Sequence, residues 1–136
     1  MRKTWHDKYL TRKKPAIEIT KHKFADMPAG TKMVISTPAE IEKEVRKVPE
    51  GCELCMAELR DHIARKHHVQ QACPITTGIF LRIASEAAIE DIIAGQKIDD
   101  VMPFWRIVKP DSTIGKKLAC GQDFISQMRR LEGIPT

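Results

Sequence analysis

The chain has 136 residues and a net charge of +5, a length at which one domain with one hydrophobic core is ordinary. Apolar residues make up 42% and charged residues 30%, which excludes a wholly disordered chain. No apolar run approaches the roughly 18 residues of a membrane-spanning helix, and no apolar core follows the charged start, as a secretory signal would require. We therefore expect a cytoplasmic protein with no membrane partner.

The positive charge is concentrated near the N-terminus. Residues 1–23 hold eight Lys or Arg side chains against Asp7 and Glu18, whereas the rest of the chain is close to neutral. Such a segment suits a phosphate backbone, where each contact releases counterions and makes affinity depend on salt. A solvated tail that aids solubility is the alternative. Residues 1–35 are predicted to form a basic N-terminal arm before a domain over residues 36–136.

The elements expected in the first half of the chain begin with a short helix around Trp5 to Leu10. Alternation over residues 16–20 predicts a strand, residues 27–30 a turn, and residues 33–35 form a short apolar run. A helix follows, with Thr37 at the N-cap, Pro38 at the first helical position and Glu40 three residues beyond the cap. This is the pattern of a capping box, and the helix is predicted to end at residues 48–51.

Two further amphipathic helices are predicted, from about Met56 to His67 and from a capping Thr76 or Thr77 to about residue 95. The inward stripe expected for the later helix is Ile79, Phe80, Ile83, Ala84, Ala87 and Ala88. This pair is typical of a helix-turn-helix. A strand over 104–108, a turn at 109–112, a second short strand and a helix over 122–132 should follow. The fold class predicted is mostly α: a winged helix-turn-helix-like domain with a small β-hairpin as wing.

Four cysteines invite a metal or redox interpretation. Cys52 and Cys55 have the C-x-x-C spacing of zinc sites, and the other ligands would have to come from Cys73, Cys120, His62, His67 or His68. No second pair completes the pattern, and a turn rather than a strand precedes Cys52, unlike a thioredoxin-like motif. We predict four reduced thiols with neither a metal nor a cofactor.

Three stretches, in consistent order and spacing, resemble the DNA-binding domain of the alkylguanine-DNA alkyltransferases (methylated-DNA–protein-cysteine methyltransferases). They are Val48-Pro49-Glu50-Gly51, Met102-Pro103-Phe104-Trp105-Arg106-Ile107-Val108, and Gly121 with Leu131-Glu132-Gly133. Cys73-Pro74-Ile75-Thr76-Thr77-Gly78 is similar to a bacterial subgroup of that family whose role is unassigned. The resemblance covers about residues 35–134 and implies a protein that binds double-stranded DNA.

In the working enzymes of that family, the second stretch carries a cysteine that takes the alkyl group, activated by the next residue, a histidine, and by a distant glutamate. Here Phe104 stands at the cysteine position and Trp105 at the histidine position, while Pro103, Arg106 and Glu132 match. The resemblance therefore implies a non-catalytic member. Phe104 and Trp105 are either core residues of a buried strand or the lining of a pocket that stacks a base without reacting.

Two other departures concern the handling of DNA. The family's tyrosine that helps rotate the target nucleotide out of the duplex corresponds to Met56 here. Its arginine that fills the vacated place in the duplex corresponds to Ile75. An apolar side chain such as that of Ile75 can also wedge into a base step. The resemblance suggests as DNA-contact candidates Ile75, Thr76, Thr77, Arg82 and Ser85, and as base-pocket candidates Met56, Pro103, Phe104, Trp105, Arg106 and Glu132. The alternatives are a capping role for Thr76 or Thr77 and a solvated face for Arg82 and Ser85.

Three functions are compatible with these features. The first is a monomeric, non-catalytic DNA-binding protein related to the alkyltransferase-like repair factors, which bind alkylated bases and pass them to excision repair, so that repair proteins would be further partners. The second is a protein-interaction module that has kept the fold without DNA binding. The third is an alkyl acceptor that uses another thiol, Cys73 or Cys120.

Overall fold

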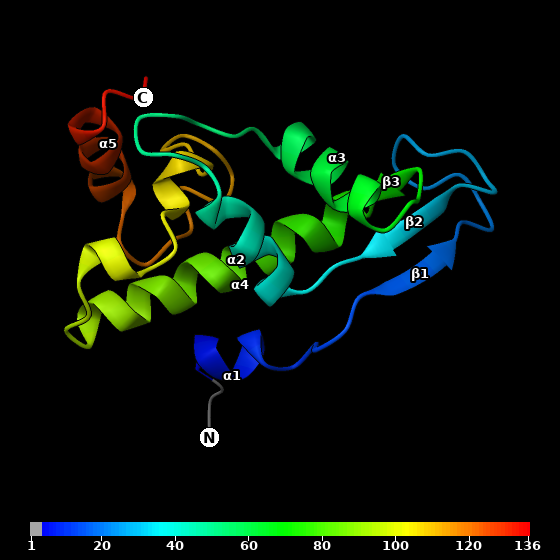
Figure 1. Cartoon of the computed structure of the whole chain (residues 1–136), viewed down its shortest axis with the longest axis horizontal. Helices are drawn as coiled ribbons and strands as arrows, with labels where there is room; N and C mark the ends of the chain where they lie inside the picture. The colour runs from blue at the N-terminus through cyan, green and yellow to red at the C-terminus, as the bar shows by residue number, and fades with distance from the viewer. Residues whose placement is uncertain (1–3) are drawn as a thin grey trace.

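The structure is a computed structural model that describes residues 4–136, so the basic residues Arg2 and Lys3 lie outside the described part of the chain. Over these residues the protein is mixed α/β, with five α-helices and one small sheet (Figure 1). The helices are α1 (Trp5–Tyr9), α2 (Pro38–Arg46), α3 (Met56–Lys66), α4 (Pro74–Ile93) and α5 (Gln122–Leu131). The strands are β1 (Ala16–Ile19), β2 (Lys32–Ile35) and β3 (Gln71–Ala72), and two 3₁₀ turns are η1 (Ile98–Asp100) and η2 (Phe104–Arg106).

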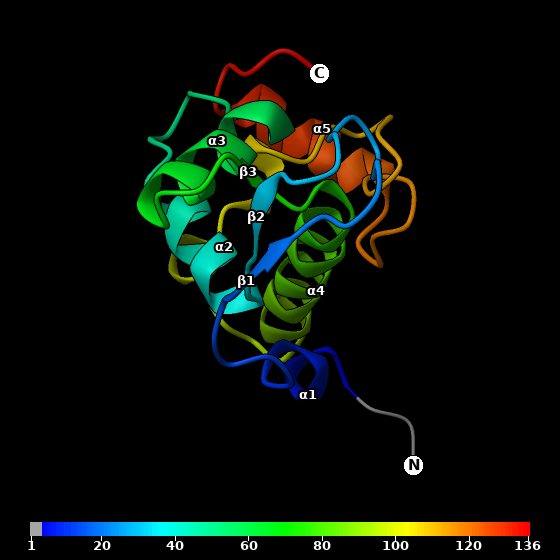
Figure 2. The ribbon, with the colours of Figure 1, turned by 90° about the vertical axis from the view of Figure 1, so that its right-hand side faces the viewer.

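Helix α4 is the long helix against which α1 and α2 both pack (Figures 1 and 2). It begins with Pro74 at the first helical position, where the missing N–H costs nothing. Its last residue is Ile93 and its C-cap is Ala94, within two residues of the predicted end at about residue 95. The Gly95 φ of 104° is left-handed, and Gln96 N–H donates to Asp91 O at 2.9 Å. This is a Schellman-type end, which favours glycine because the left-handed conformation carries no Cβ penalty.

The cap predicted for the helix after residue 36 is partly confirmed. Thr37 Oγ1 accepts a hydrogen bond from Glu40 N–H at 3.0 Å, and Pro38 begins α2. The reciprocal half of a capping box does not form, because the Glu40 carboxylate instead accepts from Ser36 Oγ and lies 2.7 Å from His67 Nε2. Glu40 therefore joins α2 to the end of α3, a long-range contact that the local pattern does not contain.

The sheet joins the N-terminal segment to the rest of the molecule. Strand β1, predicted over 16–20, pairs antiparallel with β2, and β2 pairs parallel with β3, in the order β1-β2-β3. Strand β3 lies immediately before α4, and α1 packs on α4 itself. The described part of the basic segment therefore contacts the rest of the molecule through α1 and β1.

The predicted strand over 104–108 is wrong. Residues 104–106 form η2, in which Val108 N–H donates to Phe104 O at 2.8 Å. Phe104, Trp105, Ile107 and Val108 are all buried, and a short, continuous apolar run fits a buried turn as well as a buried strand. No strand follows residue 112 within residues 4–136, so the hairpin predicted as a wing is absent there. The small hairpin is β1–β2.

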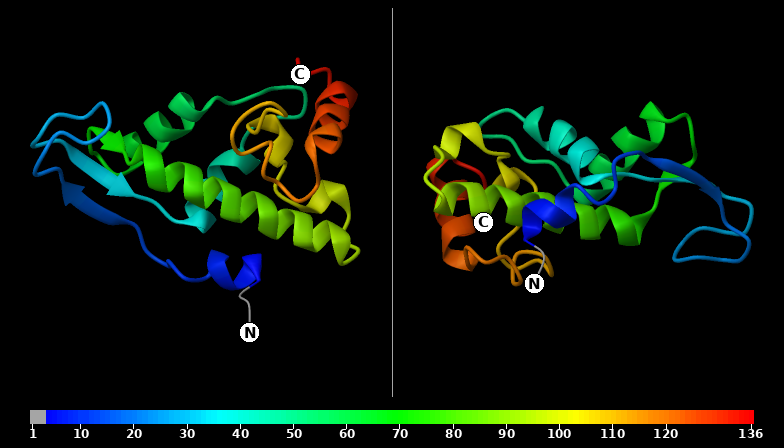
Figure 3. Two further views of the ribbon diagram at one scale, coloured as in Figure 1. Left: turned by 180° about the vertical axis from the view of Figure 1, so that it is seen from behind. Right: turned by 90° about the horizontal axis from the view of Figure 1, so that it is seen from below.

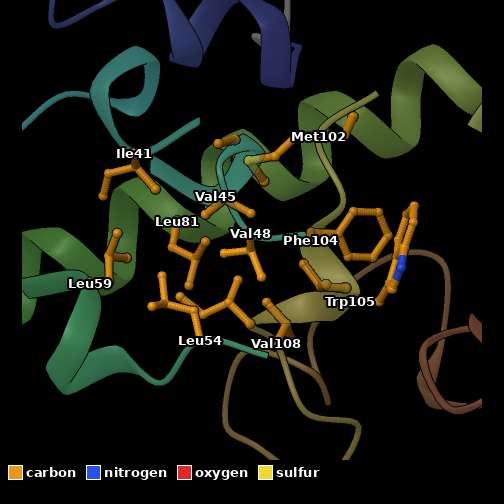
Figure 4. Packing of buried hydrophobic residues seen from close by; sticks show 14 of the residues in the cluster. Ile41, Val45, Val48, Leu54, Leu59, Leu81, Met102, Phe104, Trp105 and Val108 are labelled. Atoms are coloured by element: carbon orange, nitrogen blue, oxygen red, sulfur yellow. The ribbon is translucent and has the colours of Figure 1, made fainter. Parts of the chain in front are cut away.

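The hydrophobic core lies between α2, α3, α4 and η2 (Figure 4). Ile41 and Val45 of α2 belong to one buried cluster with Leu59 of α3, Leu81 of α4 and Phe104 of η2. Leu59 and Ile63 of α3 are fully buried, whereas Met56 is only partly buried at the start of this helix. Helices α1 and α2 thus both pack on α4, and the first half of α4 keeps exposed side chains such as Ile75 and Ile79.

Candidate nucleic-acid interface

A groove of about 500 Å³ lies between α1, the first half of α4 and the loop over residues 113–117. Three of its lining side chains are cationic, Lys8 from α1, Arg82 from α4 and Lys117 from the loop. Within the described chain the lining contains no carboxylate; its other members are Trp5, Ile75, Gly78, Ile79, Ile83, Thr113 and Ile114. The groove therefore combines an apolar floor with a positive electrostatic potential.

Helix α1 forms one wall of this groove because α4 holds it there. The N–H groups of Trp5 and His6 donate to the Glu90 carboxylate at 3.2 and 3.1 Å, and His6 Nε2 lies 2.9 Å from Asp91 Oδ1. A carboxylate at a helix N-terminus satisfies free N–H groups and the helix dipole. Tyr9 Oη donates to Glu42 of α2 at 2.6 Å, and burial, with this bond, raises the pKa of Tyr9.

Trp5 contacts two of the cationic side chains of the groove. Lys8 Nζ lies 4.1 Å and the Arg82 guanidinium 5.1 Å from the centroid of the Trp5 ring, both within the range of cation–π attraction. Arg82 also lies 3.6 Å from the buried carboxylate of Glu86 and keeps 35% of its side chain exposed. Its Nε has no hydrogen-bond partner in residues 4–136. This Nε is itself buried, so Arg82 is positioned by contacts on two sides and only the exposed part of its side chain faces the groove.

Of the five DNA-contact candidates, Ile75 and Arg82 line the groove. Ile75 is 54% exposed, whereas Thr77 and Ser85 are fully buried. Thr77 Oγ1 donates to Cys73 O at 2.6 Å, and the hydroxyl of Thr76 is buried with no hydrogen-bond partner in the described chain. The predicted outward placement of Thr77 and Ser85 is therefore wrong.

The helix phase explains these errors. Helix α4 begins at Pro74 with Cys73 as its N-cap, so Thr77 falls inside the helix and bonds back to the carbonyl four residues earlier. Leu81 and Ser85 occupy the inward stripe, and Ile79, which was predicted inward, is 50% exposed. The other groove residues were missed from the sequence, among them Trp5, Lys8, Ile79 and Lys117. Only the basic character of the N-terminal segment pointed toward any of them.

The base-pocket candidates do not form one pocket. Pro103, Trp105, Arg106 and Glu132 line a cavity of about 350 Å³. Met56 lines another, of about 360 Å³, whose walls are largely apolar and include Cys55, Leu81, Ile107 and Val108. Phe104 lines neither; it is fully buried, edge-on to Trp105 with ring centroids 5.2 Å apart and stacked on Phe124 at 6.2 Å. The aromatic pair therefore packs in the core.

Glu132 is saturated by hydrogen bonds. Its carboxylate accepts from Trp105 Nε1 at 2.7 Å, from Gly51 N–H at 3.0 Å and from Arg106 Nε at 2.8 Å. Burial opposes ionisation, but the bonds from Arg106, Gly51 and Trp105 outweigh it and hold the pKa of Glu132 below its ordinary value. Arg106 also donates to Val48 O at 2.8 Å. This network joins the 48–51 turn, η2 and the end of α5.

The thiols differ in their surroundings. Cys52 and Cys55 are exposed and Cys73 is buried. Burial, with the nearby Glu86 carboxylate, raises the pKa of Cys120 to about 11, so little thiolate is present at neutral pH. Within residues 4–136, no group of three or more His, Cys, Asp or Glu side chains is placed to hold a metal ion.

Comparison of the chain with protein-family models, with curated proteins and with solved structures gives no match. Among residues 4–136, every helix is too short or too polar to cross a bilayer.

Proposed function

We propose that this protein binds duplex DNA without reacting with it, as a non-catalytic protein of the alkyltransferase-like type. The observation that carries the proposal is the groove between α1, α4 and residues 113–117, where Lys8, Arg82 and Lys117 surround an exposed helix face with no carboxylate in the described lining. Phosphate contacts supply most of the affinity of such proteins, and side chains on a helix read the bases.

In the proposed complex, the first half of α4 enters the major groove. Lys8 from α1 and Lys117 from the loop contact phosphates, while the exposed part of the Arg82 side chain contacts a phosphate or a base edge. Ile75 and Ile79, both about half exposed, suit thymine methyl groups or a partly unstacked base step. Helices α3 and α4 act as the helix-turn-helix, and the loop over residues 109–117 takes the place of a wing.

Three observations support a non-catalytic role. Phe104 is fully buried at the position that the resemblance assigns to the nucleophile. Glu132 accepts from Trp105 and Arg106 instead of activating a base. The alternative acceptors are unsuited to attack, because Cys73 is buried and the pKa of Cys120 is raised to about 11. As a finer part of the proposal, the apolar cavity beside Met56 receives an alkylated base.

A second candidate is a protein-interaction module. Ile75 and Ile79 are adjacent on α4 and about half exposed, as the apolar floor of a protein interface would be. The two functions differ in their dependence on salt, because a duplex complex releases counterions and an apolar interface does not.

The test is a titration of labelled undamaged and alkylguanine duplexes, followed by fluorescence anisotropy, at about 50 mM and 200 mM salt. The double variant Lys8→Ala, Lys117→Ala should weaken binding to both duplexes and reduce the salt slope by about 0.9 per lost contact. The matched control is Lys43→Ala, Lys97→Ala, which removes two exposed lysines outside the groove. No binding at about 50 mM salt, or an equal loss in the control, contradicts the proposal.

A further inference from the structure

A second surface lies at the free edge of the sheet. Strand β1 is the outermost strand, and no other segment of residues 4–136 pairs with its far edge (Figures 1 and 3). An exposed edge is a template for another strand unless the protein covers or blunts it. This edge is distinct from the groove proposed to bind DNA, because none of the β1 residues lines that groove.

The register of the sheet shows which main-chain groups are free. Thr20 N–H donates to Thr31 O at 2.9 Å, and hydrogen-bonded pairs alternate along an antiparallel ladder, so Glu18 and Ala16 face β2. Ile17 and Ile19 therefore direct their N–H and C=O groups away from β2. The opposite edge of β2 agrees with this register. Lys32 O accepts from Gln70 N–H and Val34 O accepts from Cys73 N–H, so Lys32 and Val34 face β3 rather than β1.

The side chains at this edge add an apolar contact. Ile17 and Ile19 share one face of β1 and are 46% and 62% exposed. Their cross-strand neighbours are Val34 and Lys32. An added strand with apolar side chains at alternate positions would cover both isoleucines and extend the face that already carries Val34 in the core.

The charges around the edge select the kind of strand. Exposed Lys13 and Lys14 precede β1, and exposed Lys21 and Lys23 follow it. A second copy of this chain is a poor match, because an antiparallel pairing that places Ile17 opposite Ile19 of that copy also places Glu18 opposite Glu18 and Lys13 opposite Lys23. Like charges directly opposite destabilise strand pairs, whereas opposite charges stabilise them.

We propose that the free edge of β1 binds an extended acidic peptide segment of a partner protein by strand addition. Main-chain hydrogen bonds to Ile17 and Ile19 supply affinity, and the flanking lysines select acidic side chains. Together with DNA docking through α4, this surface would let the protein hold a partner at a DNA site.

The probe for the test is a labelled peptide of alternating valine and glutamate, titrated with the full-length protein. Two isomers of it carry N-methyl groups, either on every valine or on every glutamate. A peptide paired with β1 as a strand donates to it either its valine N–H groups or its glutamate N–H groups, not both. One isomer should therefore bind like the parent and the other at least about tenfold more weakly. Equal affinities for the two isomers would mean that the peptide does not pair as a strand, and would overturn the proposal.

Variants of the protein locate the site. Ile17→Pro removes an N–H that faces the free edge and no bond of the β1–β2 ladder, and it should weaken the parent peptide about tenfold. Ile17→Thr keeps that N–H and should weaken binding of the parent peptide less than Ile17→Pro does. Lys14→Glu with Lys21→Glu should weaken binding more than Lys43→Glu with Lys97→Glu, which makes the same change in net charge away from the edge.

Two outcomes would place the peptide elsewhere. Loss of binding in the Lys8→Ala, Lys117→Ala variant, with none in Ile17→Pro, would assign the peptide to the cationic groove and overturn the proposal. Dimerisation that Ile17→Pro abolishes would assign the edge to a second copy instead. If Ile17→Pro does not fold, the two methylated isomers on the unaltered protein decide. DNA binding is measured separately, so failure here leaves the proposed function standing.

Discussion

The Trp105 Nε1 atom donates to Glu132 Oε2 at 2.7 Å, and the two residues come from segments 27 positions apart. The same carboxylate accepts from Nε and Nη2 of Arg106 and from the N–H of Gly51 in the turn. The Gly51 φ is 83°, and a Cβ there would lie 3.3 Å from Glu132 O, so glycine suits this position on both counts. At the place where the resemblance puts a reactive cysteine and its base, the protein has a structural junction.

Glu132 is expected to stabilise the fold in a pH-dependent way. Glu132→Gln should lower the free energy of unfolding at pH 7 by about 2 kcal/mol, because Arg106 loses its charged partner. The pKa of Glu132 is lowered in the folded state, so its contribution is present above the ordinary carboxyl pKa of 4.5 and disappears as pH falls through the folded value. The difference between wild type and variant should therefore shrink in acid.

Urea unfolding at several pH values measures that difference. Glu50→Gln is the control, since Glu50 is exposed on the same turn. A difference for Glu132→Gln that stays constant between neutral and strongly acidic pH would contradict the assigned role.

Ser85 provides a test of the α4 phase. Its hydroxyl is fully buried with no hydrogen-bond partner among the described residues. Ser85→Ala should therefore leave the free energy of unfolding unchanged or raise it by up to about 1 kcal/mol. It should not alter duplex binding, whereas Arg82→Ala should weaken it. A Ser85→Ala variant that folds normally and binds DNA less well would place Ser85 on the outer face after all.

No alkyl group is expected to transfer from alkylguanine DNA to the protein. Phe104 has no nucleophilic atom, Cys73 is buried, and Cys120 is protonated at neutral pH because its pKa is raised to about 11. Intact-protein mass spectrometry after incubation with such DNA measures the transfer. A mass gain of one alkyl group on any cysteine would make the protein an alkyl acceptor.

The four thiols are expected to be reduced and free of metal. Cys52 and Cys55 are exposed and should react with a maleimide in the native protein, whereas buried Cys73 and half-buried Cys120 should react fully only after unfolding. Thiol titration with and without denaturant, and elemental analysis for zinc, measure these properties. One zinc per chain would show that the Cys52–Cys55 pair has other ligands.

The short-range features of this protein could be predicted from its sequence. Thr37 before Pro38, the alternation over residues 16–20 and Gly95 after an apolar helix each act within a few residues, and the structure has a cap, a strand over residues 16–19 and a helix end at those places. Local hydrogen bonds and backbone preferences determine such features, so neighbouring residues are enough to specify them.

Tertiary packing decided the rest. The segment around Phe104 is a 3₁₀ turn whose apolar side chains are buried. A continuous apolar run has no polar–apolar alternation, so its sequence does not distinguish a buried strand from a buried turn. The phase of α4 depended on the Pro74 start and on helices packed against two of its sides, which buried Ser85 and exposed Ile79. The basic segment became part of the body through Glu90, which binds the N-terminus of α1 from 84 residues away. Contacts at such separations are specified by the assembled surface, and no short stretch of the sequence contains them.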